Sequence, residues 1–476
     1  MTRPSYQSVG EVQLPSSRDL TATSRSVPVA RRLVPLALPS ALVIGALVSV
    51  PASPLNIVVV VVVLCASTLA VARIGAVDVL MHALMLSVFA ESVSVASITV
   101  GRLLAPVILL TIAGRWLLTA WKPPRIAVVT WLPAVAYIAW AWSSGLWAVH
   151  ADAWTGAMGG LVLAGAYFAA FALFVRTRVQ VLALMRTYAL GAAAAGALAL
   201  VQWKAGGRAV GLQGDANIFA LYEVLAVPVA TMLARRARGL GKGLWLLTIV
   251  LDVAAVVAAE SRGGLVTLAL LVVLLAVRND FGSGRSRKRR LQTLGAVATL
   301  LSVLIVGAFV VGGRLSPDRA AQDRGSGRLD IWHVAYVAWT AHPTLGLGAG
   351  NFQPESSHLL QTTPGVELNP GSPLLITGIK VHNVYLENLV ETGPVGLVTW
   401  LLLVGVPIRE IVRRQGWRAN DSPWSPLLPM LAAFAFATMF LSITNNKILW
   451  IMIGLAATVP RLDETRVTGR QVAGAR

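Results

Sequence analysis

Long apolar runs alternate with short polar turns along most of this chain. Runs of about 17 to 25 residues can cross a hydrocarbon layer of roughly 30 Å as helices. About fourteen such runs can be drawn, at 33–50, 55–72, 76–93, 98–118, 126–147, 154–175, 181–203, 218–234, 243–259, 263–277, 291–312, 384–408, 426–442 and 445–460. The pattern predicts an all-α polytopic membrane protein with about 12–14 transmembrane helices.

Polar stretches divide these runs into regions. Residues 1–30 are polar and lack the apolar centre of a signal peptide, so we expect a disordered cytoplasmic tail there. Residues 313–383 predict one long extracytoplasmic loop before the last three spans. The remaining predicted regions are a transmembrane bundle at 31–312, C-terminal helices at 384–460 and a cytoplasmic tail at 461–476.

Composition and charge support the membrane interpretation. The chain has 476 residues, of which 56% are hydrophobic and 13% charged, against roughly 25% charged in soluble domains. A net charge of +19 would indicate a nucleic-acid partner only if the basic residues formed one soluble surface, but they are scattered between apolar runs. Their placement fits the enrichment of Lys and Arg on the cytoplasmic side, and predicts both termini inside.

Two further features limit the chemistry. The single cysteine, Cys65, lies in an apolar run, which excludes an internal disulfide and a thiolate metal cluster. The glycines of "GLGAGNFQ" suggest a phosphate-binding loop, but such a loop follows a strand in a βαβ unit. This one follows "GRLDIWHVAYVAWTAHP", whose apolar spacing predicts an amphipathic helix on the outer leaflet ending at His342-Pro343. We therefore predict a tight turn there instead.

Arginines at the outer ends of spans stand out, because the positive-inside bias predicts few of them. Arg208 lies in "GRAVGLQGDANIFA", Arg262 in "AESRGGL" and Arg328 in "SGRLDIW". They could anchor lipid headgroups, or they could bind a diphosphate, since guanidinium pairs with phosphate oxygens. The same side also carries three loop arginines, Arg314, Arg319 and Arg324, and three carboxylates that could pair structurally with arginine, Asp215, Glu260 and Asp330.

The stretch "KVHNVYLENLVETGPVGL" places polar residues at the mouth of a span. Asn383, Glu387 and Glu391 are spaced four apart and share one helical face, directly after His382. A lone loop histidine is more often structural, but carboxylates at membrane depth usually face a protein cavity. Thr392-Gly393-Pro394 predicts a break, with Pro394 opening the next helical piece. The stretch therefore predicts a polar lid whose acidic stripe faces a cavity.

Four motifs together resemble a known family. "GDANIFA", "ESRGGL", "GRLDIWHVAYVAWTAHPTLGLGAGNF" and "HNVYLENLVETGPVGL", in this order across about residues 205–460, are similar to the O-antigen ligase and polymerase superfamily. The resemblance implies a multi-pass enzyme of the bacterial plasma membrane. Such an enzyme transfers a glycan from a polyprenyl-diphosphate carrier to a glycan or glycolipid acceptor at the outer face, without cofactor or metal.

The resemblance also implies roles for individual residues. It makes His382 the group that activates the acceptor hydroxyl, and it places Arg208, Arg262 and Arg328 at the diphosphate. We expect Asn217, Asn383, Glu387 and Glu391 to bind substrate.

One alternative comes from a different class of protein: a transporter or flippase for a lipid-linked glycan. Such a protein needs charged residues deep within several spans. The chain shows mainly Arg102 and Asp252 there, with Asp78 and Arg186 as further candidates. The denser arginine cluster at the outer face favours a transferase, and the choice between ligase and polymerase stays open.

Overall fold

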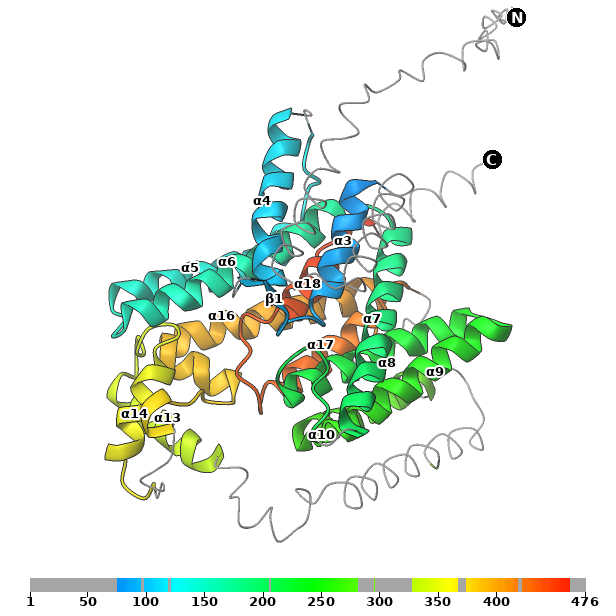
Figure 1. The fold of residues 1–476 in the computed structure, drawn as a ribbon. Coiled ribbons are helices and arrows are strands. Elements are labelled where there is room, and N and C mark those ends of the chain that lie inside the picture. The colour runs from blue at the N-terminus through cyan, green and yellow to red at the C-terminus, as the bar shows by residue number, and fades with distance from the viewer. Residues whose placement is uncertain are drawn as a thin grey trace, which may run out of the picture. The chain divides into compact units, whose positions relative to one another are not determined.

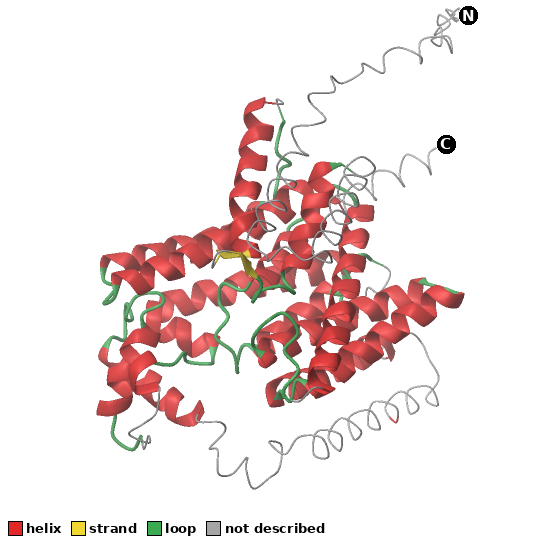
Figure 2. Cartoon of the chain, viewed as in Figure 1, coloured by secondary structure: helices red, strands yellow, loops and turns green. Residues whose placement is uncertain are grey.

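The computed structural model describes residues 75–95, 98–118, 121–204, 207–280, 295, 328–366, 374–417 and 422–462. Outside these residues lie the predicted spans at 33–50 and 55–72, the span at 291–312 apart from residue 295, the N-terminal tail, the C-terminal tail after residue 462, and the loop arginines Arg314, Arg319 and Arg324. Within them, regular structure is helical apart from one hairpin of β1 (Ser94–Val95) and β2 (Ile98–Thr99) (Figures 1 and 2). The predicted all-α class is confirmed.

The first part of the described chain contains α3 (Ala76–Ser87), α4 (Val100–Leu118), α5 (Val128–Ser143), the 3-10 turn η2 (Ser144–Leu146), α6 (Ala151–Phe174), α7 (Arg178–Lys204), α8 (Ala216–Arg236), α9 (Gly239–Ala258) and α10 (Arg262–Asp280). The second part contains α13 (Arg328–Ala341), α14 (Phe352–Thr362), α15 (Leu374–Thr377), α16 (Val384–Gln415), α17 (Leu427–Ala437) and α18 (Lys447–Ala456).

Five described helices are long and apolar enough to cross a membrane: α6, α7, α8, α9 and α16. They make the chain a polytopic membrane protein. The predicted spans at 76–93, 126–147, 426–442 and 445–460 are shorter helices, of 12, 16, 11 and 10 residues. In each case the apolar run continues into turns after the helix has ended, as it does where Val88 leaves α3. The total of 12–14 spans stays a prediction.

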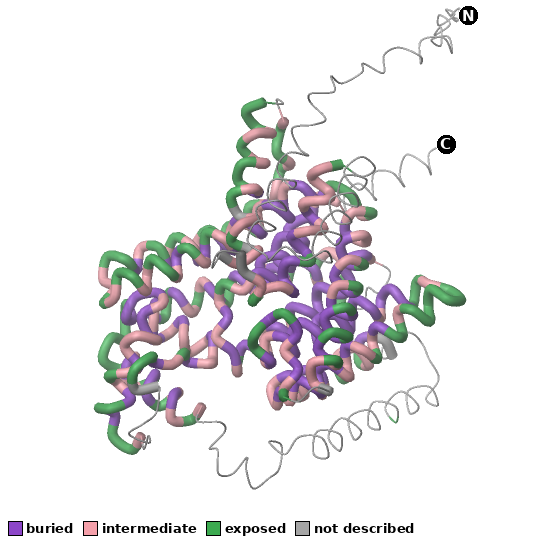
Figure 3. Tube along the Cα trace, viewed as in Figure 1, coloured by how far each residue is buried: buried purple, intermediate pink, exposed green. Residues whose placement is uncertain are grey.

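Helix α8 forms the centre of the packing. Most of its residues are buried, and it packs against α7, α9, α10 and α17 (Figure 3). Elsewhere α6 packs against α18, and α5 packs along α16. Helix α7 contributes the small-residue stretch "GAAAAGALAL", which allows close approach of neighbouring backbones, as is typical of membrane helices.

Helix α16 is broken where the sequence predicted a break. Gly393 has φ 68° and ψ −173°, and Pro394 begins the second helical piece. A Cβ at Gly393 would lie 2.1 Å from the carbonyl oxygen of Thr344. The indole Nε1 of Trp140 donates to the carbonyl of Thr392 at 2.8 Å, which satisfies a backbone acceptor that the break releases.

Two helices of the predicted loop pack on the first piece of α16. Figure 1 shows α13 and α14 side by side at one end of α16, and a separate apolar core joins them to it. Its buried residues include Ile331, Val334, Phe352 and Val390. The helix predicted at the start of the loop is present as α13, and a turn follows at His342. Its placement on a membrane leaflet stays a prediction.

Candidate active site

Several helices begin in the region of the predicted arginines. The Asp215 carboxylate caps α8 by accepting from the backbone N–H groups of Asn217 and Ile218 at 2.7 and 3.0 Å. The Ser261 hydroxyl accepts from the Gly264 N–H at 3.1 Å in the first turn of α10. Helix N-termini carry partial positive charge and favour anions.

Arg208 and Asn217 meet in one hydrogen-bond network. Arg208 Nη2 donates to Asn217 Oδ1 at 3.3 Å, and the Ser261 hydroxyl donates to the same oxygen at 2.9 Å. Arg208 Nε donates to the carbonyl of Ala259 at 3.0 Å. The network joins the start of α8 to the turn between α9 and α10.

Arg262 and Arg328 are the first residues of α10 and α13, where the helix dipole favours acidic side chains. The Arg328 guanidinium lies 6.0 Å from the centroid of the Phe440 ring, which also packs against Gly263. Burial, followed by the positive charge of Arg262, lowers the pKa of Arg328, and Asp215 opposes this shift. Two like charges held together at helix N-termini form an arrangement that a bound anion would stabilise.

His382 joins this cluster in an unusual backbone conformation. Its φ is 54°, and Glu260 is the other described non-glycine residue with positive φ. The His382 N–H donates to the Ser442 hydroxyl at 2.8 Å. Burial, followed by the charge of Arg328, lowers the pKa of the imidazole, and Asp215 partly opposes this. The ring is therefore neutral at physiological pH and can accept a proton.

The other polar residues of this stretch have different surroundings. Asn383 caps α16, because its Oδ1 accepts from the backbone N–H groups of Tyr385 and Leu386 at 3.0 and 3.1 Å. Glu387 and Glu391 line a cavity of about 430 Å³, so the predicted acidic stripe does face a cavity. The cavity lining does not include Arg208, Arg262, Arg328 or His382.

The glycine turn "GLGAGNF" binds an anion that belongs to the chain itself. The Glu391 carboxylate accepts from the backbone N–H groups of Gly350 and Phe352 at 2.7 and 3.2 Å. Gly346, Gly348 and Gly350 all have positive φ, as the predicted tight turn requires. Sequence reasoning placed Glu391 at substrate and missed this anchoring contact.

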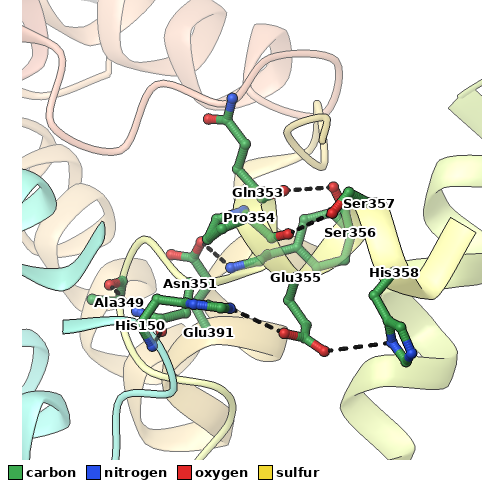
Figure 4. Close-up of polar contacts among 11 residues, drawn as sticks. His150, Ala349, Asn351, Gln353, Pro354, Glu355, Ser356, Ser357, His358 and Glu391 are labelled. Carbon is green, nitrogen blue, oxygen red and sulfur yellow. Dashed lines mark hydrogen bonds and ion pairs between the residues drawn. The ribbon is translucent and has the colours of Figure 1, made fainter. Parts of the chain in front are cut away.

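Two further clusters of titratable side chains were not predicted as clusters, although Asp252 of the second was noted as a charged residue within a span. Figure 4 shows His150 and His358 pointing at Glu355, with imidazole-to-carboxylate distances of 3.1 and 3.9 Å. Glu223 on α8 and Asp252 on α9 are fully buried in two helices that pack against each other. The interruption of the apolar run by Glu223 was a visible signal for the second cluster, whereas no local pattern connects His150 with Glu355.

The described residues contain no group of three or more His, Cys, Asp or Glu side chains placed to hold a metal ion. Metal independence stays a prediction.

Comparison with known proteins identifies part of the chain. Residues 247–401 match the sequence profile of the O-antigen ligase family. A comparison with curated proteins found no match. The matched stretch contains Arg262, Arg328 and His382, together with the cavity residues Glu387 and Glu391. Over these residues the chain is similar to the O-antigen ligase family, and its apolar helices are long enough to span a membrane.

Proposed function

We propose that this chain transfers a glycan from a polyprenyl-diphosphate carrier to an acceptor sugar at the outer face of the bacterial plasma membrane. The observation that carries the proposal is the position of His382, whose neutral imidazole is close enough to Arg328 for that charge to lower its pKa. Such a transfer needs a base that takes the acceptor proton and, close to it, positively charged side chains that bind the leaving diphosphate.

The arginines take the diphosphate in this proposal. Arg262 and Arg328 offer planar guanidinium groups that can pair with phosphate oxygens, and they start helices whose dipoles also favour an anion. Arg208 and Asn217 fix the neighbouring turn through their hydrogen bond. Negative charge grows on the diphosphate as it leaves, and fixed cations stabilise it there.

His382 takes the proton of the acceptor. The acceptor hydroxyl oxygen forms a bond to the anomeric carbon of the donor glycan, while the bond from that carbon to the diphosphate oxygen breaks. The electron pair of the broken bond remains on the diphosphate, and the hydroxyl proton moves to the imidazole of His382. The low pKa of His382 keeps this base ready at neutral pH.

The carrier's isoprenoid tail would lie against outward-facing apolar helices. Much of α9 and of α16 is not buried inside the protein, and exposed side chains there include Leu246, Val250, Val398 and Leu402. Apolar surface of this kind suits lipid chains.

One observation favours the transporter alternative. Glu223 and Asp252 are buried carboxylates in membrane-spanning helices, and residues of this kind often serve proton or ion movement. Neither carboxylate takes part in the proposed transfer. A transporter would move the intact lipid-linked glycan without breaking its glycosidic bond to the diphosphate.

The proposal is tested by His382→Ala in the purified chain. General base catalysis typically contributes about 10² to 10⁴ in rate, so transfer should fall by a similar factor. Binding of the lipid donor should change little, because the arginines remain. Both quantities are measured with a labelled lipid-linked glycan.

The matched control is His358→Ala. The His358 side chain is 71% exposed and contacts Glu355 at 3.9 Å, so transfer should stay near the wild-type rate. Equal losses in the two variants would show general loop damage, and an unchanged His382→Ala would remove His382 from the reaction.

A further inference from the structure

The cavity beside α16 is separate from the arginine cluster. Its wall comes from α5, α6, the first piece of α16, the loop around Gly350 and the segment 442–445. Its volume of about 430 Å³ lies within the range of small-molecule sites. Apolar groups such as Phe352 and Leu161 share the wall with polar ones such as Gln353 and Asn445.

One polar atom of this wall lacks a donor. Ser442 interacts with the Glu387 carboxylate, but Glu387 Oε2 is buried and has no hydrogen bond of good geometry within the described residues. By contrast, the Glu391 carboxylate is held by two backbone N–H groups, and Asn388 accepts from the Tyr137 hydroxyl at 3.0 Å. A buried carboxylate oxygen without a donor is unfavourable, and a ligand hydroxyl would relieve it.

The cavity wall includes residues that adjoin His382. Lys380 and Val381 line it and directly precede His382 in the chain. Ser442 also lines it, and the same Ser442 hydroxyl accepts the His382 N–H at 2.8 Å. A ligand against Val381 or Ser442 would therefore contact a residue that is itself bonded to the candidate base.

We infer that this cavity binds the terminal sugar of the acceptor, with Glu387 Oε2 accepting a hydrogen bond from a sugar hydroxyl. A sugar ring presents hydroxyl donors along its edge and C–H groups on its faces, which matches a wall of mixed polarity. The acceptor role rests on the proposed function, whereas sugar binding in the cavity can be measured without it.

Gly156 allows the cavity to be filled without disturbing the fold. It lies on α6 and lines the cavity, and a Cβ added there meets no atom within 4 Å. Leucine also favours a helix more than glycine does. Gly159 is the matched control, because its Cβ would also meet nothing within 4 Å and it is not part of the cavity wall.

The experiment uses the full chain purified in detergent, with methyl glycosides of glucose, galactose, mannose and N-acetylglucosamine as probes. Saturation-transfer NMR should detect binding to the wild type and to Gly159→Leu. Gly156→Leu should abolish it. Glu387→Gln keeps the shape but replaces one carboxyl oxygen with an amide NH₂ donor, so sugar affinity should fall about tenfold to a hundredfold.

A second measurement separates this inference from the proposed function. Binding of a sugar-free polyprenyl diphosphate should persist in Gly156→Leu and fall in Arg262→Ala. Sugar binding that is lost in Gly156→Leu supports the cavity site, even if no transfer is ever seen. Sugar binding that survives in Gly156→Leu, or that is absent from the wild type, overturns the inference and leaves the arginine site unaffected.

Discussion

His382 holds a left-handed backbone conformation, with φ of 54°. For a residue with a side chain this costs of order 1–3 kcal/mol and persists only where the surroundings fix it. Here the N–H groups of His382 and Val384 are held by the Ser442 hydroxyl and the Thr438 carbonyl, at 2.8 and 2.9 Å. These two hydrogen bonds therefore fix the backbone position from which the imidazole side chain extends. A base that acts at a defined place requires this.

The pKa of His382 leads to a prediction for pH dependence. Because burial and the charge of Arg328 lower this pKa, the neutral base form persists to lower pH than in a free histidine. Acidification should therefore reduce kcat/KM only below the ordinary histidine value of about 6.5. The measurement is a pH–rate profile at subsaturating acceptor. An acidic limb centred above 6.5 would contradict the assignment of His382 as the base.

The sequence predicted part of this cluster because the signals were local. Arg208, Arg262 and Arg328 stood out as cations at the predicted outer ends of spans, and the structure places each at or beside a helix start. The contacts of Asn383 and Glu391 were harder to predict from the sequence. Asn383 caps its own helix, and Glu391 binds backbone N–H groups about forty residues earlier in the chain, which residue spacing alone does not reveal.

At the scale of elements, the break in α16 was predictable and several helix ends were not. Gly393-Pro394 combines a residue that tolerates positive φ with one that can open a helix, so the sequence carries the break directly. Helix α5, by contrast, passes into a 3-10 turn at Ser144 while the surrounding residues remain largely apolar. Hydrophobicity marks burial or lipid contact, and it does not mark where the backbone leaves the helix.

Gly393→Ala tests how much the break in α16 matters to stability. Alanine at positive φ costs roughly 1–2 kcal/mol, and its Cβ would clash with the Thr344 carbonyl at 2.1 Å, so the loss should exceed that figure. Gly405→Ala on the same helix is the control. Its Cβ meets nothing within 4 Å, so it should be neutral or stabilise by about 0.5–1 kcal/mol. Thermal unfolding in detergent compares them, and equal Tm values would show that the break is not required.

At the scale of the whole molecule, the distribution of basic residues predicts the orientation. Lys and Arg favour the cytoplasmic side, which places both termini inside and the segment before α16 outside. A reporter active only outside the cytoplasm should work when joined near Gln361 and be silent after Arg476. The reverse pattern would place the arginine cluster and His382 on the cytoplasmic side and remove the basis for transfer at the outer face.

The most direct test of the account is glycan transfer by the purified chain in lipid vesicles. The vesicles carry a polyprenyl-diphosphate glycan labelled in its sugar, and an acceptor glycan is added without nucleotide sugar. The account predicts that the label moves to the acceptor, that one polyprenyl diphosphate is released per bond formed, and that His382→Ala slows both by about 10² to 10⁴. Label that stays on the lipid contradicts the account, and intact labelled lipid that crosses to the other leaflet would identify a transporter instead.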